Sequence, residues 1–462
     1  MRVTYIRSAD TLEKYYFDTE GAVPDVDRIH YSAYISSVFC ISFTGRKNFM
    51  KKKLIALMII LAMIMMPMLA ACGGGGGSEE PAGGDEGGEA EAAMKVGLIT
   101  LHDENSTYDK NFIEAFKASC EKEGVEPIIK TNIGEDQACY EAAGELVDEG
   151  CSIVFADSFG HEDFMIQAAK EFPDVQFCHA TGTKAHTEGL ANYHNAFAAI
   201  YEGRFLAGVA AGMKLNEMIE SGQITADKAK MGYVGAYTYN EVVSGYTSFF
   251  LGARYVCPSV TMDVTFTSSW YDETAEKEAA NKLMDNGCVL ISQHADSFGA
   301  PTACEDRGVP DVSYNGSTKA QGPNTYIISS RINWSPYYEY VIESVKNGTA
   351  MDPDYTGTIA TGSVEILDLN EDVAAEGTQA KLDEVKAGLE DGSIHVFDTS
   401  TFTIKGETLG DDFLADVDSD ADYTPDTNVV SDGYFHESEM RSAPYFPNAD
   451  PVDGINLLDV AF

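Results

Sequence analysis

The chain has 462 residues, with 74 acidic side chains against 31 lysines and arginines and a formal net charge of −43. This excess of negative charge argues against nucleic-acid binding, because contact with phosphates requires clustered cations. The 44% of hydrophobic and 11% of aromatic residues are enough to form packed cores, so the chain as a whole is not disordered, and its length suits two domains.

Residues 51–72 have the layout of a secretory signal peptide. They read KKKLIALMIILAMIMMPMLAAC, in which lysines precede an apolar run that ends in small residues. Pro67 and the lack of a charged stop after Cys72 weigh against the alternative, a simple membrane-spanning helix. Residues 69–72, LAAC, resemble the lipobox of bacterial lipoprotein signals. This resemblance implies cleavage before Cys72 and attachment of lipid to its sulfur.

Residues 50–72 alone make a lipoprotein signal of ordinary length that starts at Met50. We therefore expect residues 1–49 to be a non-native extension that comes from a wrongly assigned gene start. The alternative is a genuine extension that is removed along with the signal. A peptide from residues 1–45, detected by mass spectrometry in the immature protein, would contradict the first hypothesis. Residues 73–93 are rich in glycine and glutamate, and we expect them to form a flexible tether.

From Met94 onward, short apolar segments alternate with helical patterns, and the alternation occurs twice. In the first unit, strands are predicted at 95–101, 125–133, 151–158 and 175–182, with helices near 109–123, 135–150 and 162–172. In the second unit, strands are predicted at 230–237, 261–268, 288–295 and 309–315, with helices near 240–255 and from Asp272. This order predicts an α/β fold in which parallel sheets are flanked by helices.

A sequence repeat relates the two units. Residues 141–160 read EAAGELVDEGCSIVFADSFG, and residues 278–299 read EAANKLMDNGCVLISQHADSFG. A helix, a glycine, a cysteine-led strand and the pentapeptide ADSFG recur in the same order, so we interpret the units as equivalent lobes. Ligands bind beyond the carboxyl ends of parallel strands, where ADSFG lies. Two such edges predict a cleft between the lobes, with Phe159 and Phe298 near it.

Five stretches that contain these motifs resemble the basic membrane protein (BMP) family of substrate-binding lipoproteins of ABC importers. They occur in the family's order over residues 94–350: IVFADSFGHEDFMIQAAKEFPDVQFCHATG (153–182), AIYEGRFLAGVAAG (199–212), KMGYVGAYTYNEVVSGYTSFFLGAR (230–254), SSWYDETAEKEAANKLMDNGCVLISQHADS (268–297) and INWSPYY (332–338). The resemblance implies a periplasmic-binding-protein type I fold, with two similar lobes joined by crossovers. It also implies a lipid-anchored extracytoplasmic receptor that closes around a purine nucleoside or base and delivers it to a membrane permease.

These expectations divide the globular part of the chain into four segments. We expect lobe 1 at residues 94–229, lobe 2 at 230–325, and a crossover with the hinge at 326–395. Residues 396–462 are longer and more acidic than the family pattern. We expect them to form a solvated, partly ordered extension.

The loops after the predicted strands supply the candidate ligand contacts. Aromatic faces and a few directed hydrogen bonds hold flat heteroaromatic ligands, and ionised carboxylates accept well from ribose hydroxyls. The predicted ligand-binding residues are Asp103, Asn105, Tyr108, Ser158, Phe159, Tyr237, Glu241, Trp270, Asp296 and Asn315. For each of them a turn or packing role stays open, and we expect His294 to be a satisfied, partly buried histidine. Tyr314 is a further candidate to close the pocket, whereas Trp334 is expected to pack at a crossover.

Two departures from the family pattern leave the exact ligand open. Residues 101–111, LHDENSTYDKN, replace an Asp-Gly-Gly-like turn, and residues 237–241, YTYNE, replace a Pro-Ile-Pro-Glu segment. Both lie at the presumed pocket. The resemblance itself implies an alternative to a purine, a flavin or another heteroaromatic ligand, because the family is known to include flavin binders.

Two other functional classes have weaker support. A nucleoside-processing enzyme would need catalytic groups, but no GxSxG, P-loop or HExxH motif occurs, and only paired acids remain as candidates. A DNA-binding regulator conflicts with the signal peptide and the negative charge. None of the nine cysteines forms a CxxC pair or a zinc-like cluster. We therefore expect buried thiols, no cofactor and no metal.

Overall fold

The computed structural model describes residues 3–8, 11–16, 93–418, 424–447 and 450–458. The chain divides into two units, residues 1–89 and 90–462. In the first unit, β1 (Val3–Ser8) and β2 (Thr11–Tyr16) pair as an antiparallel hairpin. The predicted signal, Cys72 and nearly all of the predicted tether lie outside the described residues. Within the described part, no helix is both long enough and apolar enough to cross a membrane.

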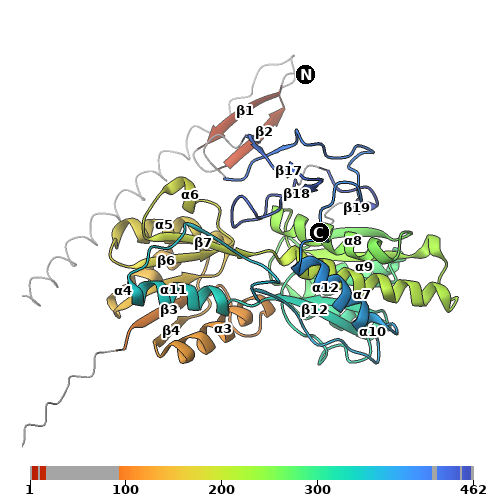
Figure 1. The fold of residues 1–462 in the computed structure, drawn as a ribbon, viewed down its shortest axis with the longest axis horizontal. Helices are drawn as coiled ribbons and strands as arrows, with labels where there is room; N and C mark the ends of the chain where they lie inside the picture. The colour runs from red at the N-terminus through yellow and green to blue at the C-terminus, as the bar shows by residue number, and fades with distance from the viewer. Residues whose placement is uncertain (1–2, 9–10, 17–92, 419–423, 448–449, 459–462) are drawn as a thin grey trace, which may run out of the picture. The chain divides into compact units, whose positions relative to one another are not determined.

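The first lobe is built on a six-stranded parallel sheet (Figure 1). In spatial order the strands are β13 (Asp354–Gly357), β7 (Tyr193–Ala198), β6 (Gln176–Ala180), β5 (Cys151–Ala156), β3 (Lys95–Ile99) and β4 (Glu126–Lys130). The helices are α3 (Thr107–Glu123), α4 (Gln137–Asp148), α5 (Glu162–Glu171), α6 (Ala185–Glu188) and α11 (Ser335–Asn347). Two pairs, α3 with α11 and α4 with α5, pack against each other, and the sheet is covered through two separate apolar clusters.

The second lobe is built on a seven-stranded sheet. In spatial order its strands are β14 (Val364–Ile366), β12 (Tyr326–Ile332), β11 (Asp311–Tyr314), β10 (Leu290–His294), β8 (Lys230–Gly235), β9 (Thr261–Phe266) and β19 (Ile455–Leu457). Only β14 is antiparallel to its neighbour. The helices are α7 (Ile200–Glu220), α8 (Asn240–Val256), α9 (Glu273–Asp285), α10 (Gly299–Arg307) and α12 (Thr378–Glu390).

The lobes repeat one strand order. The series β4-β3-β5-β6-β7 in the first sheet corresponds to β9-β8-β10-β11-β12 in the second. The ADSFG pentapeptides follow β5 and β10, which hold the same place in the two series. The predicted fold class, two similar α/β lobes with mainly parallel sheets, is confirmed.

The lobe boundaries differ from those expected after residues 229 and 325. Helix α7 packs on α8, and β12 pairs with β11, so both belong to the second lobe. The chain therefore crosses from the first lobe to the second after β7. It returns to the first lobe at α11, after β12, and crosses to the second lobe again between β13 and β14. Helix α7 is apolar around most of its circumference, which suits a helix buried against several elements.

The described part of the C-terminal segment is packed onto the body, and this corrects the expectation of a solvated extension. Phe397, Phe435, Phe446 and Val452 are each at most 4% exposed and belong to the main apolar cluster. Besides β19, the segment contains the short pairs β15 (Leu414–Ala415) with β16 (Thr427–Asn428), and β17 (Val430–Ser431) with β18 (Tyr434–Phe435). The expectation rested on the acidic composition of the segment and did not consider these buried apolar side chains.

The cysteines of the described part are buried. They are Cys120, Cys139, Cys151, Cys178, Cys257, Cys288 and Cys304, and none of them is in a disulfide. Burial raises the pKa of the Cys120 thiol to about 12, so this thiol stays protonated at neutral pH. The expectation of buried thiols is confirmed for these seven.

Helices α7 and α8 cross at contact distance between their backbones. A Cβ atom on Gly208 would lie 2.0 Å from the backbone oxygen of Phe249, and one on Gly252 would lie 2.0 Å from that of Phe205. Real Cβ atoms do not approach an oxygen so closely. The glycines therefore set the distance between the helices, and through them the position of the second sheet.

Replacing Gly208 with alanine is expected to destabilise the protein by about 2 kcal/mol or more. Alanine favours a helix over glycine by roughly 1 kcal/mol, but here the added methyl group must push two backbones apart. Gly144 in α4 is the matched control, because its nearest Cβ contact is 3.9 Å away. Gly144→Ala should be neutral or stabilising in urea unfolding. Equal effects of the two changes would contradict the close crossing.

Candidate functional site

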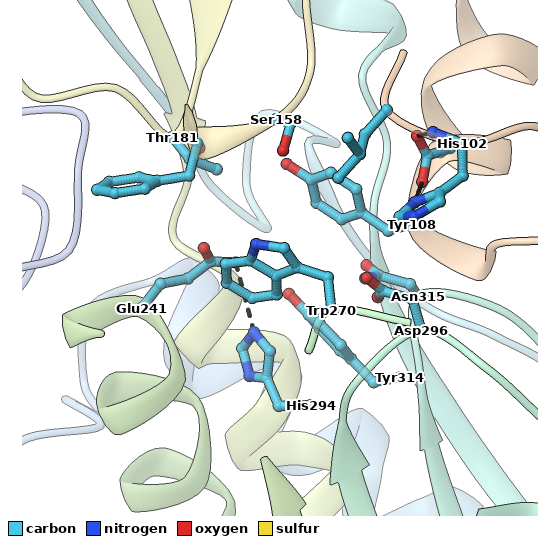
Figure 2. Close-up of a pocket in the computed structure, with 13 residues that line it drawn as sticks. His102, Tyr108, Ser158, Thr181, Glu241, Trp270, His294, Asp296, Tyr314 and Asn315 are labelled. Atoms are coloured by element: carbon cyan, nitrogen blue, oxygen red, sulfur yellow. Dashed lines mark hydrogen bonds and ion pairs between the residues drawn. The ribbon is translucent and has the colours of Figure 1, made fainter. Parts of the chain in front are cut away.

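A pocket lies between the lobes where the strands of both sheets end (Figure 2). Its lining follows the strands β3, β5, β6, β8, β9, β10 and β11, and comprises Leu101, His102, Tyr108, Asp109, Ser158, Phe159, Thr181, Glu241, Trp270, His294, Asp296, Tyr314 and Asn315. This is the carboxyl edge at which doubly wound sheets bind ligands. The two equivalent edges face each other across one cavity.

Seven of the ten predicted ligand-binding residues line this pocket: Tyr108, Ser158, Phe159, Glu241, Trp270, Asp296 and Asn315. Asp103 and Asn105 do not, because the Asp103 carboxylate accepts hydrogen bonds from the backbone and side-chain nitrogens of Asn105 in a surface turn. Tyr237 lies behind the pocket wall, with its ring 5.1 Å from that of Trp270. The prediction that these three residues line the pocket is therefore wrong. Ligand contact by the other seven stays a prediction.

Four lining residues were missed by the sequence prediction. They are Leu101, His102, Asp109 and Thr181. Asp109 lies in the first turn of α3, where an acidic residue is ordinarily explained by the helix dipole. Thr181 follows β6, the same position relative to its strand that pointed to Asn315 after β11. Tyr314, a candidate to close the pocket, also lines it, as does His294, which was expected to be a partly buried histidine and is buried.

Asp109 is a buried carboxylate held ionised by the turn that caps α3. Ser106 is the N-cap, and its hydroxyl lies 2.5 Å from Asp109 Oδ2. The backbone nitrogen of His102 donates to Asp109 Oδ1 at 2.7 Å, and its ring Nδ1 lies 3.3 Å from Oδ2. Burial opposes ionisation, but these hydrogen bonds outweigh it and lower the pKa of Asp109. A strong acceptor is thus available at the pocket edge.

Asp157 and Asp296 are the repeat-related acids, and both are buried. Asp157 Oδ1 accepts from the backbone nitrogen of Leu101 at 3.1 Å and closes the end of the first sheet. Asp296 instead faces the pocket. Burial, followed by the charge of Asp109, raises the pKa of both carboxyls well above the ordinary value. The aspartate of the pentapeptide thus belongs to the frame in one lobe and to the cavity lining in the other.

A second acid, Glu276 on α9, supports the turn that carries Asp296. Its carboxylate accepts from the backbone nitrogen of Ser297 at 3.2 Å and from that of Asp272 at 3.1 Å. The side chain is fully buried, and burial raises the pKa of Glu276 to about 7. The native state therefore binds a proton there that the unfolded chain releases from about pH 4.5 upward.

The stability contributed by protonated Glu276 should be lost as pH rises from about 4.5 to 7. Native protein holds more protons than unfolded protein in this window, so the free energy of unfolding falls as pH rises, by about 3 kcal/mol for a shift of this size. Urea unfolding at pH 5 and pH 8 measures the loss. Glu276→Gln should reduce it, whereas Glu121→Gln, at an exposed position, should not. Parallel pH profiles for all three proteins would contradict the prediction.

Aromatic rings from both lobes surround the cavity. Figure 2 shows Trp270 in the middle of the labelled side chains, with Asp296 and Asn315 towards His102 and with Glu241 and Thr181 on the other side. Tyr108 is fixed by donating its hydroxyl to the Asp157 carbonyl oxygen at 2.8 Å. Faces of this kind suit a flat ring.

His294 forms part of a hydrogen-bonded floor. Its Nε2 lies 3.4 Å from Glu241 Oε1, and its Nδ1 lies 3.4 Å from the Tyr233 hydroxyl. Tyr233 in turn accepts from the guanidinium of Arg204 at 3.3 Å. This direction of donation assigns the neutral tautomer with the proton on Nε2. Burial lowers the pKa of His294, so the ring stays neutral at physiological pH.

Backbone strain and unpaired polar atoms also mark the pocket. Thr181 and Asn315 have φ of 66° and 61°, in the left-handed region that non-glycine residues rarely occupy. The Thr181 and Tyr314 hydroxyls are buried and find no hydrogen-bond partner among the described residues. Buried polar groups are normally paired. A ligand that carries hydrogen-bonding groups would satisfy them.

The lobes touch each other across the cleft. The backbone nitrogen and the hydroxyl of Thr107 each lie 3.2 Å from the Asp296 carbonyl oxygen, and the rings of Phe159 and Tyr239 stack at 5.1 Å. In this arrangement the pocket measures about 20 Å³, room for about one water molecule. A heteroaromatic ring therefore enters only when the lobes or the aromatic side chains move.

The pocket lining contains acids but no lysine or arginine. The acids are Asp109, which is held ionised, Glu241, and Asp296, whose raised pKa favours the protonated form. Among the described residues, no cluster of histidine, cysteine and acidic side chains could hold a metal ion. The lining can therefore accept hydrogen bonds from hydroxyl and amino groups, but it repels phosphate.

Comparisons with known proteins agree with this geometry. Residues 98–395 match the Bmp family model, described as ABC transporter substrate-binding protein, PnrA-like. A purine-binding protein of Brucella abortus is 31% identical over 335 residues, 70% of this chain and 91% of that protein. A putative ABC transporter glucose-binding protein of Haloferax volcanii is 35% identical over 216 residues, 47% of this chain and about half of that protein (51%).

A solved structure supports the fold. A solute-binding protein of an ABC transporter system from Conexibacter woesei aligns with a TM-score of 0.54 at 20% identity, and covers 66% of this chain and 98% of that one. The family match extends over both lobes and ends at residue 395, before the C-terminal segment. The chain thus belongs to the Bmp family, the PnrA-like substrate-binding proteins of ABC transporters.

Proposed function

We propose that this protein captures a purine nucleoside or purine base between its two lobes and delivers it to a membrane permease. The observation that carries the proposal is the joint presence, in one cavity, of aromatic faces and buried carboxylates from both lobes. The similarity to a purine-binding protein of Brucella abortus supports it. The family consists of solute-binding proteins rather than enzymes, so the ligand is bound and released unchanged.

The charge of the lining favours a nucleoside or base over a nucleotide. Asp109 and Asp296 are acceptors for ribose hydroxyls or ring amino groups. A phosphate would meet Asp109, Glu241 and Asp296 but no lysine or arginine of the lining, and burying a charge without an opposite charge is unfavourable. A glucose-like sugar, suggested by the name of the Haloferax relative, could use the same carboxylates. Its C–H faces would pack on the aromatic rings, so glucose belongs in the ligand panel.

Binding is expected to follow hinge motion of the lobes. The contacts between Thr107 and Asp296, and between Phe159 and Tyr239, must break for a ring to enter the small cavity. After entry, the same surfaces close on the ligand. A ligand-dependent decrease in the radius of gyration in X-ray scattering would support this motion.

Native mass spectrometry of protein purified without refolding tests the ligand class. We expect a co-purified mass that matches a purine base or nucleoside, and a rise in melting temperature with that compound. Glucose, riboflavin and nucleoside monophosphates complete the panel, and unchanged concentration of each compound after incubation checks for turnover. A flavin or sugar as the stabilising compound, or no response to any purine, would refute the purine assignment.

We further propose that the chain is anchored outside the cytoplasm by lipid on Cys72. The support is the lipobox-like LAAC at residues 69–72 after an apolar run, and dual acylation would make such anchoring stable. Cys72→Ala should abolish incorporation of labelled palmitate and leave the signal uncleaved, whereas Ser78→Ala should change neither. Labelling that persists in Cys72→Ala would refute the anchor.

A further inference from the structure

The C-terminal segment, residues 396–458, lies beyond the family match, which ends at residue 395. Figure 1 shows its described part in blue, with the labels β17, β18 and β19. The segment lies outside the family match, and none of its residues lines the inner pocket. Its role must therefore be inferred from its contacts, which it makes with both lobes.

The end of the segment is fixed to the second lobe. Strand β19 extends the second sheet by parallel pairing with β9. Just before it, the Asp453 carbonyl oxygen accepts from the guanidinium of Arg254 at 2.7 Å, and the Gly454 carbonyl oxygen accepts from the backbone nitrogen of Met262 at 3.0 Å. These contacts hold the segment to the sheet that carries Trp270 and Asp296.

The middle of the segment is fixed to the first lobe. Thr356 on β13 donates its hydroxyl to the Ser438 carbonyl oxygen at 3.0 Å. Ser442 donates its hydroxyl to Asp354 Oδ1, also on β13, at 3.1 Å. The segment therefore crosses from one lobe to the other next to the cleft.

A second cavity lies beneath this crossing. It measures about 200 Å³, about ten times the inner pocket, and shares Phe159, Thr181 and Glu241 with that pocket. Its remaining wall includes Val417, Ala443 and Tyr445 of the C-terminal segment. The two cavities are thus adjoining compartments of one site, and the segment closes the outer one.

The chemistry of the outer compartment restricts what it can hold. The Thr181 hydroxyl is buried at the junction without a partner among the described residues, and Thr183 and Asn240 add polar groups. The charged side chains that line it, Glu241 and Asp416, are acidic, and no lysine or arginine lines it. An uncharged group with several hydroxyls fits this lining, and a phosphate does not.

We propose that the described part of the C-terminal segment forms the outer wall of the ligand site. The compartment beneath it then holds an uncharged, hydroxyl-bearing part of the ligand, such as the sugar of a nucleoside, while the aromatic ring occupies the inner pocket. This proposal rests on the proposed function. It implies in addition that contacts with the C-terminal segment change the affinity for nucleosides but not the affinity for free bases.

Filling the outer compartment tests the proposal. Isothermal titration of the full chain with the pairs adenosine and adenine, guanosine and guanine, and inosine and hypoxanthine gives the preference of the unaltered protein. Ala443→Phe should weaken nucleoside binding at least tenfold and leave base binding within twofold. Thr183→Phe fills the compartment from the first lobe, and should do the same without changing the C-terminal segment. Met440→Phe, which alters an exposed side chain outside the compartment, is the matched control.

The outcomes separate this proposal from the proposed function. If no base and no nucleoside binds the unaltered protein, the purine assignment fails and the proposal fails with it. If purines bind, but both filling variants leave the nucleoside-to-base ratio unchanged, only the outer compartment is refuted. An equal loss of base and nucleoside affinity in both variants also refutes it, because the segment would then act on the whole site.

Discussion

Trp270→Ala is expected to weaken purine binding about ten- to hundredfold. Trp270 is partly buried, lines the pocket from the end of β9, and packs edge-on against Tyr237 at 5.1 Å. Because Tyr237 already holds the Trp270 ring in place, binding of ligand loses little side-chain entropy at Trp270. Loss of one aromatic face costs about 1–3 kcal/mol when it stacks on a base. Isothermal titration with the purine that stabilises the unaltered protein gives the change in Kd.

The other tryptophan provides the matched control. Trp334 is 3% exposed and stacks on Phe112 with ring centroids 4.2 Å apart, outside the pocket lining. Trp334→Ala should therefore lower the free energy of unfolding by about 3–5 kcal/mol and leave affinity nearly unchanged.

Because the chain has two tryptophans, fluorescence distinguishes them. Ligand should still change the emission of Trp334→Phe, but not that of Trp270→Phe. Unchanged affinity in Trp270→Ala would contradict the stacking role.

The sequence repeat predicted the position of the site because it located the strand ends. Trp270 and Asp296 were selected as residues that follow predicted strands, and both line the cavity. Parallel strands bring their carboxyl ends to one edge, so residues 26 apart in the chain meet there. This inference requires only the order of elements, which hydrophobic periodicity shows well.

The missed residues depend on local backbone geometry that periodicity does not show. Asp103 and Asn105 were chosen because they lie in the first loop, yet they bond to each other. The loop turns earlier than expected, so His102 and Asp109 reach the pocket instead.

The C-terminal segment was misjudged for a different reason. The net negative charge of the segment comes mainly from exposed side chains. Its packing against the lobes depends instead on buried apolar side chains such as Phe435 and Phe446.

Arg204 is a structural group that the sequence contained without revealing its role. It stands in the family-like stretch AIYEGRFLAGVAAG, at residues 199–212, as a lone cation in an apolar helix. In the structure its side chain is 0% exposed. It donates to the Ser292 hydroxyl at 2.7 Å and to the Ser313 carbonyl oxygen at 3.1 Å. The guanidinium also lies 5.0–5.5 Å from the ring centroids of Tyr233, Phe249 and Tyr314.

Arg204→Ala is expected to lower the free energy of unfolding by about 3–5 kcal/mol. Two effects compete. Removing a buried cation recovers its desolvation cost, but the change also leaves a cavity, removes a cation–π contact from three rings and removes a hydrogen bond to the Ser313 carbonyl oxygen. We expect the second group to win, since the guanidinium donates to several acceptors at once. Urea unfolding measures the change.

Two further variants separate shape from hydrogen bonding at Arg204. Arg204→Met retains most of the volume and should cost less stability than Arg204→Ala. It still removes the donor to Tyr233, and with it the support of His294 in the pocket floor, so it should weaken ligand binding in a folded protein. Arg331→Ala is the control, because that arginine pairs with Glu365 near the surface and should cost at most about 1 kcal/mol. If Arg204→Ala is as stable as the unaltered protein, desolvation of the buried cation cancels all of its contacts. If Arg204→Met binds ligand as tightly as the unaltered protein, the floor of the pocket does not depend on Arg204.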